Sequence, residues 1–107
     1  MSEYITMNEV NNPGTEIHLY FNGYVGLYVA YGISAFLLSK ETNVSPSYSV
    51  DMQMPAAVIN VAHYNLLKEK LEIKRETENY RCLKVTTPYD ENEYAEWASN
   101  LRGIKGL

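Results

Sequence analysis

Two β-rich runs flank the dipeptide Asn22-Gly23, and this arrangement constrains the fold more than any other feature of the chain. Apolar and polar side chains alternate from Glu16 to Phe21, as they do in a half-buried strand. Asn and Gly both tolerate positive φ, which the tightest β-hairpin turns require. The second run, residues 24–29, is apolar on both faces, as is typical of an inner strand. The sequence therefore predicts a hairpin near the middle of a sheet.

The remaining elements follow from periodicity and turn residues. No turn signal interrupts residues 30–40, so the inner strand should run directly into a helix. Pro55 lacks an N–H and should separate two strands or mark an edge. Asp90 and Glu93 resemble a capping box at the start of a last helix, and Gly103 should end it. We expect strands at 48–52, 57–61, 72–77 and 81–87, and helices at 62–71 and 90–102.

These elements predict an α+β fold. We expect a mixed sheet of five or six strands with two to three flanking helices, in the order ββα-ββα-ββα. A chain of 107 residues with 46% hydrophobic residues suits one domain, which we place at residues 16–102. Residues 1–15 are polar and end in Asn-Asn-Pro-Gly, so they are expected to form a flexible tail. Residues 103–107 are expected to fray.

The cysteine content and the hydropathy of the chain bear on where in the cell the protein is found. Cys82 is the single cysteine, and a lone thiol is typical of a reducing, cytoplasmic environment. The longest nearly apolar run, residues 24–38, is shorter than the ~20 residues that a membrane span needs. No signal peptide is visible. We therefore expect a cytoplasmic protein that does not interact with membranes.

No arrangement of residues predicts catalysis or a cofactor. Cys82 falls in the middle of a predicted strand, where burial would raise its pKa and reduce its reactivity. Gly-x-Ser-x-Gly and phosphate-binding glycine loops are both missing from the sequence. His18, His63 and Cys82 lack the close spacing typical of metal ligands, so no metal site is expected. The chain is thus predicted not to be an enzyme.

Tyrosine is the residue type in excess, with ten copies. Its large ring and polar hydroxyl suit both half-buried sheet positions and protein interfaces. We expect Tyr28, Tyr31 and Tyr64 in the core. The leading hypothesis is a binding or adaptor module that meets a protein partner or a second copy of itself through an aromatic surface. The candidate residues of that surface are Tyr20, Tyr24 and Tyr48.

Two alternative functions remain open at this stage. Nucleic-acid binding would use the basic residues of the second half, although acids interrupt them and a solvated mixed face explains them as well. Its candidate residues are Lys68, Lys70, Lys74, Arg75, Arg81 and Lys84, with Tyr64 and Tyr80 nearby. A small-molecule sensor would instead need a pocket between the helix at 30–40 and the sheet.

Two segments resemble a known family. Residues 23–35, GYVGLYVAYGISA, and residues 54–63, MPAAVINVAH, are similar to parts of the N-terminal, mismatch-recognition domain of MutS-type proteins and of small bacterial proteins of that kind. The resemblance covers about residues 16–87 and implies a mixed sheet flanked by helices. In MutS proteins a Phe-x-Glu motif after the glycine reads mismatches. Val25 and Leu27 stand at those places here, so the resemblance does not imply mismatch reading.

Overall fold

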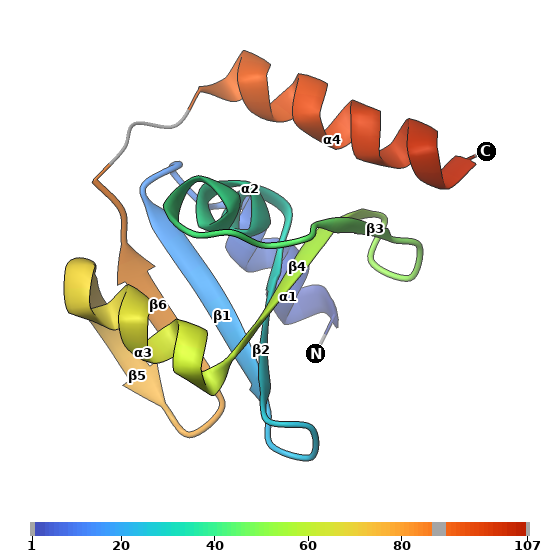
Figure 1. Cartoon of the computed structure of the whole chain (residues 1–107). Coiled ribbons are helices and arrows are strands. Elements are labelled where there is room, and N and C mark those ends of the chain that lie inside the picture. Colours follow the sequence, from blue (N-terminus) through green and yellow to red (C-terminus); the bar gives the residue numbers. More distant parts are fainter. Residues whose placement is uncertain (1, 87–89, 107) are drawn as a thin grey trace.

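The computed structural model describes residues 2–86 and 90–106, which form one sheet with helices around it (Figure 1). The sheet has six strands, as predicted, and the fold is α+β. The described elements, in chain order, are α1 (Ser2–Val10), β1 (Glu16–Asn22), β2 (Leu27–Tyr31), α2 (Gly32–Glu41), β3 (Ser47–Ser49), β4 (Met54–Asn60), α3 (Val61–Lys70), β5 (Glu72–Thr77), β6 (Tyr80–Lys84) and α4 (Glu91–Gly106).

The strand order across the sheet is β3-β4-β2-β1-β6-β5. The predicted mixed sheet is wrong, because every described strand pair is antiparallel. Three of the five pairs are hairpins, and the two long-range pairs, β2 with β4 and β1 with β6, also run in opposite directions. β1 and β2 occupy the centre of the sheet, as the alternation and the apolar second run predicted.

Helices cover both faces of the sheet (Figure 1). α2 and α3 lie on one face, and α1 lies on the opposite face. The larger core is formed between the sheet and α2 and α3, and it includes the fully buried residues Ile17, Leu19, Leu37 and Leu83. A smaller cluster lies under α1 and contains Ile5, Tyr20, Tyr80 and Cys82. Side chains alternate between the faces of a strand, so β1 contributes to both clusters.

The turn between β1 and β2 is longer than the Asn-Gly dipeptide predicted. It spans residues 23–26, so β2 begins at Leu27 instead of Tyr24. The Asn22 carbonyl accepts the Gly26 N–H at 2.9 Å, and the Asn22 side-chain oxygen accepts the Tyr24 N–H at 3.0 Å. Gly26 has φ +66°, which glycine adopts without strain. Tyr24 and Val25 consequently lie in an exposed turn and not in an inner strand.

The N-terminal residues correct a second expectation. Residues 1–15 were expected to form a flexible tail, but Ser2–Val10 forms α1, which buries Ile5 and Glu9. Both carboxylate oxygens of Glu9 accept hydrogen bonds from Ser34, in the first turn of α2. The residue before α2, Tyr31, makes no side-chain cap. Glu9 therefore satisfies donors that α2 itself leaves unpaired, and this holds α1 in place.

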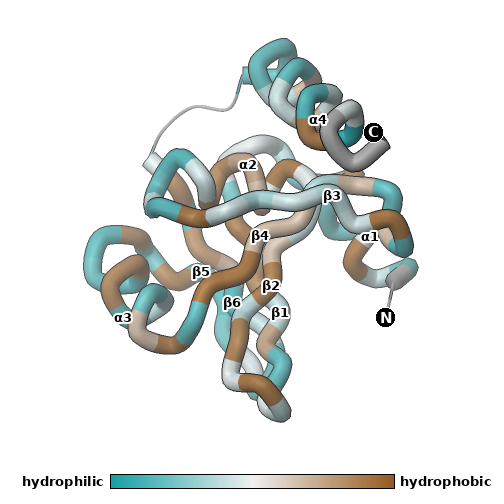
Figure 2. Tube along the Cα trace, turned by 45° about the vertical axis from the view of Figure 1, so that its right-hand side comes forward, coloured by the Kyte–Doolittle hydropathy of each residue, from teal (hydrophilic) through white to brown (hydrophobic). Residues whose placement is uncertain are grey.

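Helix α4 begins as predicted but ends later. The Asp90 side chain accepts the N–H groups of Asn92 and Glu93, which confirms Asp90 as the cap, while the Glu93 side chain forms an ion pair with Lys40 of α2. Gly103 does not end the helix, which continues to Gly106, so residues 103–106 are helical rather than frayed; residue 107 lies outside the described residues. Gly103 lacks the positive φ that ends helices at glycine. α4 is mostly hydrophilic (Figure 2) and packs on α2 through Trp97 and Phe36, with ring centroids 5.2 Å apart.

None of the helices within residues 2–86 and 90–106 combines the length and the apolar character needed to cross a membrane.

Candidate functional site

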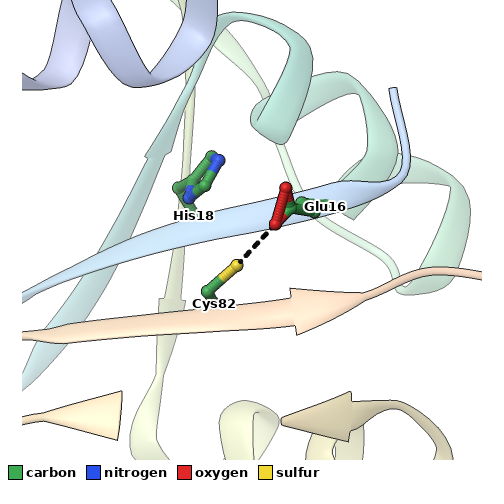
Figure 3. A group of neighbouring side chains, drawn as sticks. All are labelled: Glu16, His18 and Cys82. Carbon is green, nitrogen blue, oxygen red and sulfur yellow. Dashed lines mark hydrogen bonds between the residues drawn. The ribbon is translucent and has the colours of Figure 1, made fainter. Parts of the chain in front are cut away.

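A polar cluster lies on the sheet face that α1 partly covers. Glu16 and His18 are two residues apart on β1 and so point to the same face. His18 pairs directly with Cys82 of β6 in the sheet register. The pairing of β1 with β6 thus brings Glu16 and His18 next to Cys82, although Glu16 and Cys82 are 66 residues apart in the chain (Figure 3).

The three side chains are close enough to share one ligand. One potential ligand atom from each of Glu16, His18 and Cys82 lies within 4.8 Å of the other two. The Cys82 thiol donates to Oε2 of Glu16 at 3.2 Å, as the dashed line in Figure 3 marks. The Tyr80 hydroxyl lies 2.5 Å from Nδ1 of His18 and fixes the orientation of the ring. Lys74 approaches the same Glu16 oxygen at 3.2 Å.

Burial and neighbouring charges set the protonation of this cluster. Burial lowers the pKa of His18, so the imidazole is neutral at pH 7. Burial also raises the pKa of the Cys82 thiol to about 11, with the Glu16 carboxylate adding to the effect. This confirms the raised pKa expected for a thiol in mid-strand. Partial burial acts to raise the pKa of Glu16, but the Cys82 hydrogen bond and Lys74 outweigh it and hold the pKa below its usual value.

The cluster borders a small polar cavity of about 190 Å³. Its wall combines the three clustered side chains with residues from α1, β5 and β6. The lining residues are Asn8, Asn11, Glu16, His18, Arg75, Tyr80 and Cys82. The cavity has room for a few water-sized groups, and its lining supplies nitrogen, oxygen and sulfur donors.

Sequence reasoning considered His18 and Cys82 as ligands but did not place them together. The signal that could have joined them is the register of β1 against β6, which is a long-range pairing. Glu16 was taken only as the start of a strand. The alternation in β1 places His18 on the polar side of its strand, and His18 is buried there because α1 lies over that side.

A second candidate site lies at the tip of the β1–β2 hairpin. We call it the hairpin-tip surface. It borders a cavity of about 460 Å³ between this tip and α1. Most of its side chains are apolar or aromatic, and none of the lining residues carries a charge. The lining residues are Ile5, Tyr20, Phe21, Asn22, Gly23, Tyr24, Val29, Tyr31 and Asn79.

The three tyrosines predicted to form a binding face lie in different surroundings. Tyr24 is fully exposed, while Tyr20 is buried, although both line the cavity of the hairpin-tip surface. Tyr48 lies elsewhere and lines a separate cavity of about 300 Å³ beside α4. Two of the three therefore share one surface. Of the tyrosines predicted for the core, Tyr28 and Tyr64 are buried and Tyr31 is half-buried.

The six basic residues proposed for nucleic-acid binding come from α3, β5 and β6. Lys74 pairs with Glu16, and the Arg81 Nε lies 3.3 Å from Oε2 of Glu76, an ion pair without hydrogen-bond geometry. Lys70 donates to the carbonyl of Glu41. The other members of the set are Lys68, Arg75 and Lys84. Two of the six basic side chains, those of Lys74 and Arg81, thus form ion pairs within the chain.

The aromatic residues assigned to the same site do not offer stacking faces. Tyr64 and Tyr80 are both buried. The Tyr64 ring packs against Tyr28, with centroids 4.5 Å apart, and lies under Lys68 and Arg81. A nucleic-acid base needs an open ring face on which to stack. Neither tyrosine provides one in this conformation.

Comparisons with family models, with curated proteins and with solved structures found no match to this chain. The resemblance to the MutS N-terminal domain stays a prediction from the sequence.

Proposed function

We propose that this protein is a non-enzymatic binding module that associates with a second copy of itself through the hairpin-tip surface. The observation that carries the proposal is the pairing of a projecting ring and a cavity in one uncharged patch. Tyr24 is fully exposed on the turn, which extends beyond the sheet (Figure 1), and the cavity of about 460 Å³ lies beside it.

A two-fold symmetric dimer uses the same patch on both subunits, so that patch must be complementary to itself. A protruding aromatic side chain next to a hollow of side-chain size meets this requirement. Tyr24 of one copy would enter the cavity of the other, with Val25 beside it. Both are large exposed apolar residues at the tip of the hairpin. Aromatic anchors that fill pockets are the usual centres of binding energy at protein interfaces.

The charge and rigidity of the patch also support this occupant. The chain has a net charge of −4, so two copies repel each other overall. The lining residues of the patch are uncharged, and no like charges meet there. The turn is held by two hydrogen bonds that Asn22 accepts, which reduces the entropy lost when Tyr24 becomes fixed at an interface.

The test is the mass of the full chain in solution, measured by sedimentation over a range of concentrations. Wild type should form a dimer as concentration rises, and Tyr24→Ser should remain a monomer. Leu66→Ser is the matched control, because Leu66 is an exposed apolar residue of α3 that does not line the cavity at the tip. It should dimerise like wild type.

Substitution of a fully exposed side chain changes the free energy of unfolding by less than about 0.5 kcal/mol, so Tyr24→Ser should stay folded. A wild type that is monomeric up to millimolar concentration would refute the proposal. Equal loss of dimer in both variants would also refute it. A monomer that binds a different protein or a small molecule at the tip would point to the adaptor or sensor alternatives instead.

A further inference from the structure

We propose that Glu16, His18 and Cys82 form a binding site for a divalent transition metal, with Zn²⁺ as the expected ion. The site lies on the face of the sheet under α1 and is separate from the hairpin-tip surface. One potential ligand atom from each residue falls within 4.8 Å of the others. The inference does not depend on the proposed self-association.

The distances are near those of a metal centre. With Zn–S of ~2.3 Å and Zn–O of ~2.0 Å, a tetrahedral site separates sulfur from oxygen by roughly 3.5 Å. The Cys82 sulfur and Oε2 of Glu16 are 3.2 Å apart, joined by the thiol hydrogen bond (Figure 3). The widest separation in the group needs to contract by about 1 Å to reach ligand spacing. The Cys82–Glu16 pair is already at that spacing, and rotation of the Glu16 side chain, which is half-buried at the start of β1, can bring its carboxylate closer to the His18 ring.

The donor types select the metal. A thiolate, an imidazole and a carboxylate together suit Zn²⁺, which accepts sulfur, nitrogen and oxygen ligands in tetrahedral sites. Mg²⁺ and Ca²⁺ prefer oxygen ligands alone and are disfavoured here. Three protein ligands leave a fourth position, which water from the adjoining polar cavity of about 190 Å³ can fill.

Binding of Zn²⁺ releases one proton and leaves the ion and its ligands neutral overall. The Zn–S bond replaces the S–H bond of Cys82, and the released proton passes to solvent. One thiolate and one carboxylate then neutralise the two charges of the ion. The Glu16 oxygen exchanges its hydrogen bond from Cys82 for a bond to the metal, while Lys74 can still approach it from the exposed side.

The surrounding residues already orient one ligand. The Tyr80 hydroxyl lies 2.5 Å from Nδ1 of His18, and the two rings stack with centroids 5.8 Å apart. This contact restricts the rotation of the His18 ring before an ion binds. His18 and Cys82 are also buried and are held opposite each other by the strand register. The site is therefore largely formed before any ion arrives.

The test titrates the reduced full chain with Co²⁺, which occupies zinc sites and absorbs light. Cys82 is the single cysteine, so a thiolate-to-cobalt charge-transfer band would report its coordination specifically. We expect this band to saturate at one Co²⁺ per chain and to disappear when Zn²⁺ is added. Zn²⁺ should also raise the melting temperature, because it binds the folded state.

Variants separate this site from adventitious binding. Cys82→Ser should abolish the band, and Glu16→Gln should weaken Co²⁺ binding by more than ~100-fold, beyond the ~10–100-fold that the loss of an orienting residue costs. His63→Gln is the matched control, since His63 is the other histidine and lies on α3. It should bind like wild type. Glu16→Gln alters only a half-buried side chain, so it remains informative if Cys82→Ser fails to fold.

Absence of the charge-transfer band in wild type at millimolar Co²⁺ would overturn the proposal. A Zn²⁺-dependent rise in melting temperature that is unchanged in Glu16→Gln but lost in His63→Gln would also overturn it.

Discussion

The Ser34 hydroxyl donates a 2.6 Å hydrogen bond to Oε2 of Glu9, and the Ser34 N–H donates one of 2.9 Å to Oε1 of the same carboxylate. Both residues are buried. Ser34 also accepts the N–H of His18, so the contact joins α1, α2 and β1 at one point. An acidic side chain from one helix thus serves as the N-terminal cap of another, where the helix dipole favours negative charge.

Replacement of Glu9 should destabilise the fold. Glu9→Ala removes both acceptors and leaves the buried Ser34 donors unsatisfied, which typically costs about 1–3 kcal/mol. The free energy of unfolding from urea titration is the measurement. Glu3→Ala is the control, because Glu3 is an exposed acid on the same helix. Its effect should stay within about 0.5 kcal/mol, and an equal loss in both variants would contradict the capping role.

The same carboxylate should make stability depend on pH. Burial raises the pKa of Glu9 from 4.5 to about 7, although the Ser34 hydrogen bonds act in the opposite direction. A raised native pKa means that the folded state holds its proton more tightly than the unfolded state. The stabilisation that the raised pKa of Glu9 gives to the folded state is therefore complete below pH 4.5, and it is lost as the pH rises to about 7. This pKa shift corresponds to a change in the free energy of unfolding on the order of 3 kcal/mol.

Comparison with Glu9→Gln isolates this contribution. Gln cannot titrate, so the difference in unfolding free energy between wild type and Glu9→Gln should fall between pH 4.5 and 7 and stay constant above pH 7. His18, whose lowered pKa acts in the opposite sense, is present in both proteins and cancels. A pH-independent difference across this range would show that Glu9 titrates normally.

Local patterns predicted most of the sheet. The alternation in β1 and the turn residues of the β5–β6 hairpin located strands that the structure contains. Ile17 and Leu19 are buried on one face of β1, as their spacing predicted, because successive side chains of a strand point to opposite faces. α1 was missed because Ile5 is its one buried apolar residue and its other anchor, Glu9, is a residue type that normally faces water.

The candidate sites depend on relations that local patterns do not contain. His18 meets Cys82 only through the pairing of β1 with β6, and the burial of both follows from α1, which sequence periodicity did not indicate. At the hairpin tip, Asn22-Gly23 predicted a turn correctly. The extension of that turn to Gly26 depends on hydrogen bonds to Asn22, and this extension is what exposes Tyr24.

Gly32 should be intolerant of a side chain for two reasons. It has φ +56°, and an added Cβ would lie 3.3 Å from the Glu9 Cγ and from the Met54 sulfur. Gly26→Ala is the matched control, since Gly26 has φ +66° but nothing within 4 Å of its Cβ position. Backbone strain of ~1–2 kcal/mol should apply to both variants.

The crowding at Gly32 should make Gly32→Ala less stable than Gly26→Ala when both are unfolded in urea. It should also displace Glu9 and reduce the pH dependence described above. An equal loss of stability in the two variants would mean that the flexible Glu9 and Met54 side chains move aside without an energetic cost.

The attachment of α4 to the domain should depend on aromatic packing and little on charge. Phe36 is buried in α2 and contacts Tyr94 and Trp97 of α4 at centroid distances of 5.6 and 5.2 Å. Phe36→Ala should cost about 3–5 kcal/mol through lost burial and the cavity left behind. An ion pair between Lys40 and Glu93 joins the same two helices. Lys40→Gln should cost less than about 1 kcal/mol, because both partners are partly exposed and screened by solvent.

Trp97 is the single tryptophan, so its fluorescence reports the docking of α4 directly. Phe36→Ala should shift its emission to longer wavelength as the indole becomes hydrated, while Lys40→Gln should leave the emission unchanged. Addition of 1 M salt, where charges are screened beyond ~3 Å, should also leave wild-type emission unchanged. A red shift in salt or in Lys40→Gln comparable to that of Phe36→Ala would mean that the ion pair, and not the ring cluster, holds α4 on α2.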